Sequence, residues 1–320
     1  MKIVLDIDKL LADGEITVAE YERFKRFSRR DTGSLAFNVL VGFGVVATAG
    51  GAVALLPSAL TAIVVGAVLA AAGLALTFKR AEEWGLLGSI LLLVGSLASA
   101  GGLIALLEGG AVGFLLVTVL CGAGAVMAKS VLLAMIATLA LSASVGAMTA
   151  YQHASYFLAI RQPTVTIALF TLVGVVAYQV SKRVASDYER LALAVARTSL
   201  FLVNLGFWVG SLWGDSLWRQ RDNWNFRSSA AIPDWVFVVG WAVGLVATAT
   251  WGARSNRRWV VNLSTVFGAI HFYTQYFELL GPSPGSILLA GLTAIGVALA
   301  IFRYNKRAAA AAREAREIGV

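Results

Sequence analysis

Three polar side chains that could do chemistry lie on one face of an otherwise apolar segment. His271, Gln275 and Glu278 are spaced four and three residues apart, which places them on the same side of a helix. A histidine beside a carboxylate can relay a proton or hold a polar group of a substrate. The alternative is that His271 forms a hydrogen bond between helices and that Glu278 contacts water at a membrane surface.

A second polar pair, Gln152 and His153, ends another apolar segment, and we expect it on the same membrane side, where both clusters could share one vestibule. Other chemistry is sparse. The chain has two histidines and a single cysteine, Cys121, which argues against a metal site and a disulfide framework. It contains no phosphate-binding loop. We therefore expect no enzyme, no cofactor and no metal.

The segments that carry these residues have the composition of membrane spans. Of the 320 residues, 58% are hydrophobic and only 14% are charged, whereas soluble domains carry about 25% charge. Apolar runs long enough for a hydrocarbon core recur along the chain, and in lipid such runs must be helices. We predict an all-α, polytopic transmembrane helical bundle of about ten spans, at 34–56, 58–78, 84–107, 110–128, 130–152, 163–180, 193–213, 234–252, 259–279 and 283–302.

The cations orient these spans. With the N-terminus in the cytoplasm, 22 of the 26 lysines and arginines fall in inner segments, and Arg161, Arg219, Arg221 and Arg227 fall outside. This is the positive-inside pattern, and it predicts an inner membrane protein with both termini cytoplasmic. The net charge of +8 lies in loops beside the spans, where anionic lipid attracts cations. We therefore expect the lipid bilayer, and no nucleic acid, as a partner.

Glycines within the spans predict close contacts between helices, because small residues let helix backbones approach in lipid. Segment 47–56 resembles segment 98–107, which indicates that 34–78 is repeated directly as 84–128; the alternative is that spans of similar composition match by chance. Asn38, Asn204, Asn262 and Gln179 are expected to form hydrogen bonds between helices. The predicted packing glycines are Gly50, Gly51, Gly101, Gly102, Gly206, Gly210 and Gly214.

The first 31 residues differ from the rest because they have the pattern of a soluble helix–turn–helix. Asp13-Gly14 separates two short amphipathic segments, and Thr17 with Glu20 forms a capping box for the second one. So small a unit cannot fold alone. We expect it to pack on the membrane domain, on lipid headgroups or on a second copy of the chain, or to bind a protein partner. The predicted domains are a cytoplasmic head (1–31), a transmembrane domain (32–303) and a basic cytoplasmic tail (304–320).

The head also carries a resemblance. Leu10-Leu11-Ala-Asp-Gly14-Glu-Ile16-Thr17, followed by Glu20-Tyr21, is similar to short helical modules of bacterial membrane proteins that mediate oligomerisation. With the Gly-rich first span and the aromatic stretch 272–277, it resembles the bacterial predicted-membrane-protein family called domain of unknown function 2157. Gln275 stands where that family would have arginine. The resemblance implies a bacterial membrane topology and no particular activity.

Two functions fit these patterns. The first is a structural or regulatory membrane protein that binds a partner through its head. The second is a small-molecule transporter or exporter, because ten spans with inside termini resemble drug and metabolite carriers. Transporter sites tend to use helices broken near the midplane, whereas the five prolines here all lie at the ends of spans. The first function is therefore favoured.

Overall fold

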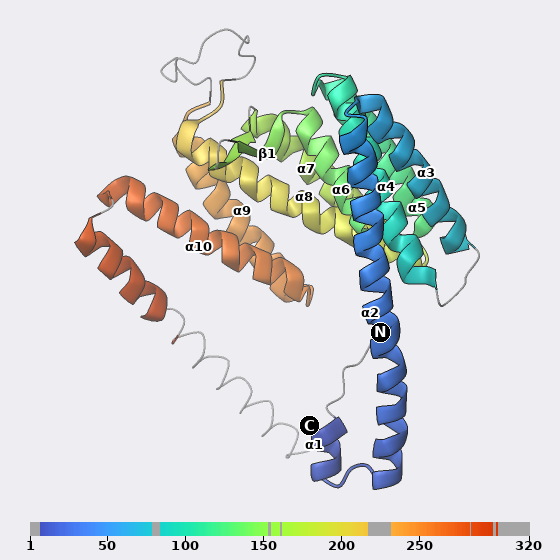
Figure 1. Ribbon diagram of the computed structural model, residues 1–320. Coiled ribbons are helices and arrows are strands. Elements are labelled where there is room, and N and C mark those ends of the chain that lie inside the picture. The colour runs from blue at the N-terminus through green and yellow to red at the C-terminus, as the bar shows by residue number, and fades with distance from the viewer. Residues whose placement is uncertain are drawn as a thin grey trace. The chain divides into compact units, whose positions relative to one another are not determined.

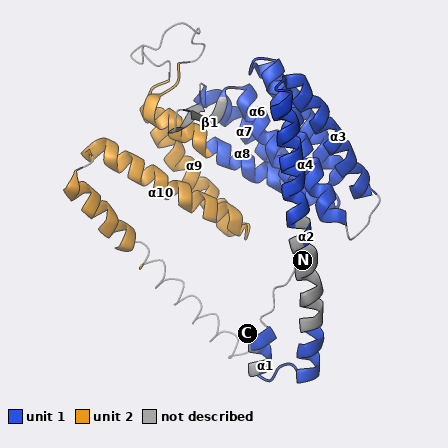
Figure 2. Ribbon diagram, viewed as in Figure 1, with its two compact units in different colours: residues 1–203 blue, residues 204–320 orange. Residues whose placement is uncertain are grey.

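The computed structural model describes residues 7–78, 84–152, 155–160, 162–216, 232–281, 283–296 and 299. The chain divides into two compact units, Met1–Val203 and Asn204–Val320, each of which is described by itself (Figure 2). Helices dominate both units (Figure 1). The helix Ser186–Trp213 is divided between them: its last turns, from Asn204, belong to the second unit, together with the helices that follow.

The helices and strands follow one another in the order in which the chain is coloured in Figure 1. Their bounds are α1 (Ile7–Ala12), α2 (Val18–Leu55), α3 (Ala59–Phe78), α4 (Gly85–Leu106), α5 (Ala111–Ala128), α6 (Val131–Ser144), β1 (Ala147–Gln152), β2 (Ser155–Ile160), α7 (Pro163–Ser181), α8 (Ser186–Trp213), α9 (Asp234–Arg254) and α10 (Arg258–Leu280). A further apolar helix, Pro284–Gly296, follows α10.

Six of these helices are long and apolar enough to cross a membrane: α3, α4, α5, α7, α8 and α9. Three apolar helical stretches are shorter, namely Val39–Leu55 within α2, α6 and Pro284–Gly296. Helix α10 has 23 residues but is not one of these six. Helices thus lie at each of the ten predicted positions, and six of them meet the length and composition of a span.

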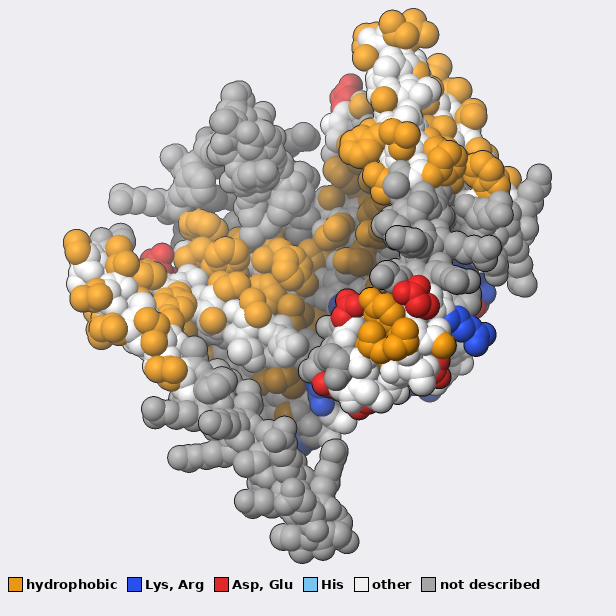
Figure 3. All heavy atoms as spheres, turned by 60° about the horizontal axis from the view of Figure 1, so that its bottom comes forward, with side chains coloured by type: hydrophobic (Ala, Val, Ile, Leu, Met, Phe, Trp, Pro, Cys, Tyr) orange, Lys and Arg blue, Asp and Glu red, His pale blue; other side chains and the backbone are white. Residues whose placement is uncertain are grey.

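Several small and polar residues lie inside the units, and many large apolar residues lie outside. Thr166 and Ser199 are fully buried, whereas Leu40 and Phe43 are 72% exposed. Water-soluble proteins bury their large apolar residues, and a surface this apolar is typical of contact with lipid or protein. Charged side chains lie together where α1 and α2 begin, whereas hydrophobic side chains form much of the remaining described surface in this view (Figure 3).

The predicted span 130–152 is wrong in its second half. Helix α6 ends at Ser144, Gly146 adopts a positive φ of 83°, and β1 and β2 form an antiparallel hairpin in which Gln152 pairs with Ser155. A left-handed glycine commonly terminates a helix, and the residues beyond it include Thr149 and several aromatics, which favour strands. Hydrophobicity alone could not predict this change from helix to strand, because the sequence stays apolar on both sides of Gly146.

The N-terminal helices form as the capping pattern predicts. Gly14 has a φ of 73° in the turn after α1. Thr17 caps α2, with its amide nitrogen 2.9 Å from Glu20 Oε2. Tyr21 donates a hydrogen bond to Asp8 Oδ1 (2.8 Å), which ties α1 to α2. However, α2 continues to Leu55 without a break, so the second helix of the predicted head and the first span are one helix.

The closest helix contact joins α3 and α4, and glycines at a spacing of seven residues allow it. A Cβ built at Gly66 would lie 2.6 Å from the carbonyl oxygen of Gly95, and one at Gly95 would lie 2.5 Å from that of Gly66. Gly73 and Gly102 meet the facing backbone equally closely. Real Cβ atoms do not approach backbone this closely, so only glycine fits, and residues seven apart share a helix face.

This contact corrects the predicted packing glycines. Gly50, Gly51 and Gly101 have no atom of the described residues within 4 Å of an added Cβ, so they make no close contact between the described helices. Gly102 does, and Gly210 does too, since a Cβ there would lie 2.5 Å from the ring of Phe237. The predicted set consisted of adjacent glycine pairs and of glycines spaced four residues apart, whereas the glycines of the α3–α4 contact are spaced seven residues apart. The duplication of 34–78 as 84–128 stays a prediction.

Candidate functional site

The predicted polar face of α10 points towards a cluster of polar and aromatic side chains within the second unit. His271 lies edge-on to the indole of Trp241, with 4.7 Å between the ring centroids and 68° between the planes. Trp241 is 1% exposed and packs with Leu245 and Phe267 in an apolar core. The histidine therefore sits at the boundary between this core and the more polar end of α10.

Hydrogen bonds join the three helices around this cluster. Trp241 Nε1 donates to Asn204 Oδ1 (2.9 Å), which links α9 to α8. Trp208 Nε1 donates to Thr274 Oγ1 (3.1 Å), which links α8 to α10. The predicted role of Asn204 as a hydrogen-bonding residue between helices is confirmed. Polar contacts of this kind hold helices together in lipid, where each contributes about 0.6–2 kcal/mol.

Two atoms of the predicted site are buried and have no hydrogen-bond partner among the described residues. They are Nδ1 of His271 and Nε2 of Gln275, one helical turn apart on α10. A side-chain amide nitrogen donates, and an imidazole nitrogen donates or accepts according to its tautomer. Since buried polar atoms are normally satisfied, this pair could hold a water molecule or a small polar group.

Glu278 differs from the other two residues because its side chain is exposed. It lies in the last turn of α10, which ends at Leu280 before Gly281 with a φ of 68°. No ion pair joins it to His271 in the described structure. The face therefore contains a half-buried histidine and glutamine, each with one buried nitrogen, and a separate exposed carboxylate, rather than a paired proton relay.

The aromatic end of α10 binds the helix that follows it. Tyr273 donates to the carbonyl oxygen of Ala290 (2.9 Å), and Tyr276 donates to that of Ser286 (3.2 Å). Both acceptors belong to the helix Pro284–Gly296. The tyrosines of the stretch 272–277, which carried part of the family resemblance, thus have a structural role in closing this helical hairpin.

The remaining predicted residues are placed elsewhere or not described. Gln152 ends β1 in the first unit, while His271 belongs to the second, so a shared vestibule stays a prediction. His153 lies outside the described residues. Gly206 is buried on α8, and Gly214 ends that helix with a φ of 66°. Gly214 therefore terminates the helix, whereas the predicted role was packing.

Sequence reasoning missed three residues of the cluster: Trp208, Trp241 and Thr274. The chain has nine tryptophans, and tryptophan in a span is first expected at the membrane interface. Trp208 and Trp241 are distinguished by hydrogen bonds from their indoles to polar residues on other helices. These bonds depend on tertiary structure and cannot be predicted from the sequence. The described residues contain no group of three or more His, Cys, Asp or Glu that could hold a metal.

The long apolar helices and the apolar surface are those of a helical membrane protein. No protein-family model, curated protein or solved structure matches the chain. The resemblance of its two ends to the family of domain of unknown function 2157 therefore stays a prediction.

Proposed function

We propose that this protein is a bacterial inner membrane protein of ten spans with both termini in the cytoplasm, and that it has a structural or regulatory role. The placement of 22 of 26 cations in alternate connections supports this orientation. The four helical stretches that fall short of the six strongest spans are α6, α10, the apolar part of α2 and Pro284–Gly296. Each lies between connections of opposite predicted sides.

The observation that carries the partner-binding role is the apolar surface at the start of α2. Val18 is 68% exposed and Phe24 is 44% exposed, and Glu20, Glu22 and Arg23 lie beside them in the sequence. Apolar side chains surrounded by charge are typical of a surface that another protein covers. Because α2 runs unbroken from this surface to Leu55, binding at the head would act on a helix that reaches the membrane.

The role is tested by changing the head surface and measuring assembly. Phe24→Ser should lower the oligomer size, or the recovery of a bound protein, in native electrophoresis and light scattering of the purified full chain. Glu22→Ser is the matched control, since Glu22 is also exposed but points to another side of α2. Equal assembly of both variants and the parent chain would contradict a binding role for this surface.

The orientation is tested separately with reporter fusions. Fusions after Ser181, after Ser255 and at the C-terminus should report cytoplasm, and fusions after Glu108, Arg221 and Gly281 should report the opposite side. A cytoplasmic signal after Arg221 would contradict the ten-span topology. Each site lies in or beside a predicted connection, so an error in the span count reverses every signal beyond it.

A second candidate function, solute binding or transport, is favoured by one observation: the buried His271 Nδ1 and Gln275 Nε2 have no hydrogen-bond partner among the described residues. In a Cys121→Ala background, His271→Cys and Gln275→Cys should react with a small water-soluble thiol reagent if this face is hydrated. Val266→Cys is the control, because Val266 is 57% exposed on the same helix within the apolar part of the sequence. Failure of the first two to react would exclude a hydrated site.

A further inference from the structure

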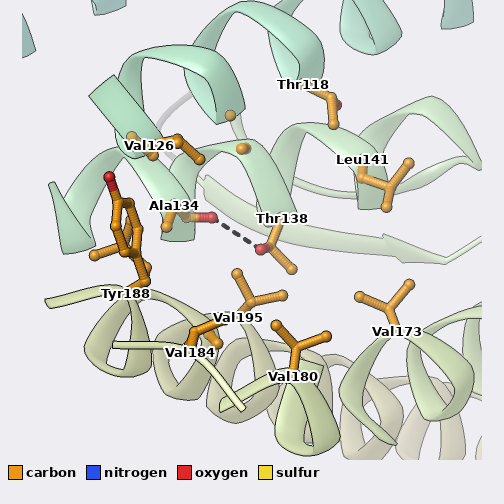
Figure 4. Close-up of a pocket in the computed structure, with 15 residues that line it drawn as sticks. Thr118, Val126, Ala134, Thr138, Leu141, Val173, Val180, Val184, Tyr188 and Val195 are labelled. Atoms are coloured by element: carbon orange, nitrogen blue, oxygen red, sulfur yellow. Dashed lines mark hydrogen bonds between the residues drawn. The ribbon is translucent and has the colours of Figure 1, made fainter. Parts of the chain in front are cut away.

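Helices α5, α6, α7 and α8 surround an elongated cavity of about 450 Å³ in the first unit. Tyr188 and Val126 lie at one end, and Leu141 and Val173 lie at the other (Figure 4). The lining residues cover about two helical turns on each helix, so the cavity extends roughly 10 Å along the helix axes at 1.5 Å per residue. Its volume is in the range of small-molecule sites.

The lining offers almost no hydrogen-bonding groups. Most of it is glycine, alanine, valine and leucine. Its two threonines donate their hydroxyls to their own helix: Thr118 to the carbonyl oxygen of Phe114 (2.8 Å) and Thr138 to that of Ala134 (2.9 Å). A polar solute would lose its water contacts here without replacement. The cavity therefore favours an aliphatic occupant.

The cavity is buried on one side and open on another. Ala125, Ala134 and Thr138 are less than 6% exposed, whereas Val126 is 54% exposed and Val180 is 42% exposed. The exposed residues belong to helices with the length and composition of membrane spans. An occupant could thus enter sideways from the hydrocarbon layer, as a lipid chain would.

Positive charge lies at the Tyr188 end of the cavity. The connections after α5 and α7 and the first turn of α8 contribute four cations and two carboxylates, a net charge of two positive: Lys129, Lys182, Arg183 and Arg190, with Asp187 and Glu189. Lys129 forms an ion pair with Asp187 (2.5 Å) and lies over the ring of Tyr188, 5.7 Å from its centroid. Lys129 also has a left-handed backbone, with φ 51° and ψ 36°.

Lys129 ends α5 beside the cavity. Glu108 and Asn256 have the same left-handed conformation just after α4 and α9, and such a residue commonly terminates a helix. Here the left-handed residue turns the chain directly from α5 into α6, so that the cation sits beside the opening of the cavity. Anionic lipids attract lysine and arginine at the membrane surface.

We propose that this cavity binds one acyl chain of an anionic phospholipid, with the phosphate of its headgroup held by the cations beside Tyr188. The inference rests on the proposed membrane location, but it does not depend on the number of spans or on the role of the head. Chain binding depends on the aliphatic lining, and the choice of an anionic headgroup depends on the net positive rim. The two parts can therefore be tested independently.

Chain binding is tested with the full-length protein in micelles that contain phosphatidylglycerol with a photoreactive group near the end of its acyl chain. Mass spectrometry should locate crosslinks on the lining segments 118–126, 134–141, 173–180 and 188–195. Ala192→Phe fills the cavity and should lower this labelling several-fold. Ala123→Phe is the matched control, since Ala123 is exposed on α5 and does not line the cavity, and it should leave the labelling unchanged.

Circular dichroism and size-exclusion chromatography establish that each variant folds, and Ala192→Leu replaces Ala192→Phe if the larger side chain prevents folding. Equal labelling of the parent chain, the filled variant and the control would show only lipid around the outside of the helices and would overturn the proposal. Labelling that Ala192→Phe removes would support it.

Headgroup choice is tested by replacing phosphatidylglycerol with phosphatidylcholine. The parent chain should be labelled more strongly by the anionic lipid, and Lys182→Gln combined with Arg183→Gln should reduce this preference while crosslinks on the lining persist. Arg254→Gln, which removes a cation elsewhere, is the control. Inorganic phosphate at millimolar concentration should not compete if the lipid is the ligand. An equal response to both lipids, or complete competition by phosphate, would overturn the assignment of an anionic phospholipid.

Discussion

Replacing Gly95 by alanine should separate α3 from α4, because nothing but hydrogen fits between their backbones there. An added Cβ would lie 2.3 Å from the amide nitrogen of Ala70 and 2.5 Å from the carbonyl oxygen of Gly66. Since carbon atoms pack best at about 3.5–4.0 Å, the backbones must move apart by roughly 1 Å, which forfeits about a quarter to a half of the dispersion energy of nearby contacts.

The expected cost follows from comparable overpacking. Inserting a methyl group into a well-packed interior costs about 1–3 kcal/mol, which is roughly a five- to 150-fold change in the unfolding equilibrium constant. Gly101→Ala is the matched control, because it makes the same change on the same helix where an added Cβ meets no described atom within 4 Å. It should be neutral or stabilising by up to about 1 kcal/mol, as alanine favours helix over glycine.

The measurement is unfolding of the purified protein in mixed lipid–detergent micelles, titrated with sodium dodecyl sulfate and followed by circular dichroism. Gly66→Ala and the double variant complete a mutant cycle. Because Gly66 and Gly95 face each other across one contact, the double variant should cost less than the sum of the two single changes. Equal midpoints for Gly95→Ala and Gly101→Ala, or strict additivity in the cycle, would refute the argument.

Other outcomes follow from the same structure. Hydrogen bonds from the backbone and side chain of Thr17 lower the pKa of Glu20. The cap therefore stabilises the helix fully above the ordinary glutamate pKa, about 4.3, and this stability is lost as the pH falls through the lowered pKa. Amide hydrogen exchange at residues 17–21 should become faster in acid, and Glu20→Gln should remove this pH dependence. Trp241→Phe removes the hydrogen bond to Asn204 and should destabilise the protein by about 0.5–1.5 kcal/mol, whereas Trp235→Phe, at a position 63% exposed, should cost less; equal losses in the same titration would contradict a role for the buried bond. Gly146→Ala places a side chain at a φ of 83° and should destabilise the junction between α6 and β1 by about 1–2 kcal/mol, which proteolysis within 145–160 would report; unchanged cleavage would argue against that turn.

The positions of the helices were predictable from the sequence, since a span needs only a run of apolar residues and that property is local. Gly14 and the Thr17–Glu20 capping box were predictable for the same reason, because their contacts lie within four residues. The hairpin at Ala147–Ile160 was not. Hydrophobicity continues across Gly146, and the change from helix to strand depends on its backbone conformation, which composition does not report.

In the candidate site, too, local sequence predicted one part and tertiary structure decided the other. Helical spacing placed His271 and Gln275 on one face of α10, and both have a buried nitrogen there. What each face meets was decided by tertiary structure: Trp241 lies against His271, and Glu278 remains exposed. The α3–α4 contact likewise depends on tertiary structure. Many glycines are available, but only those that oppose another backbone are required, and which ones do so depends on how two helices align.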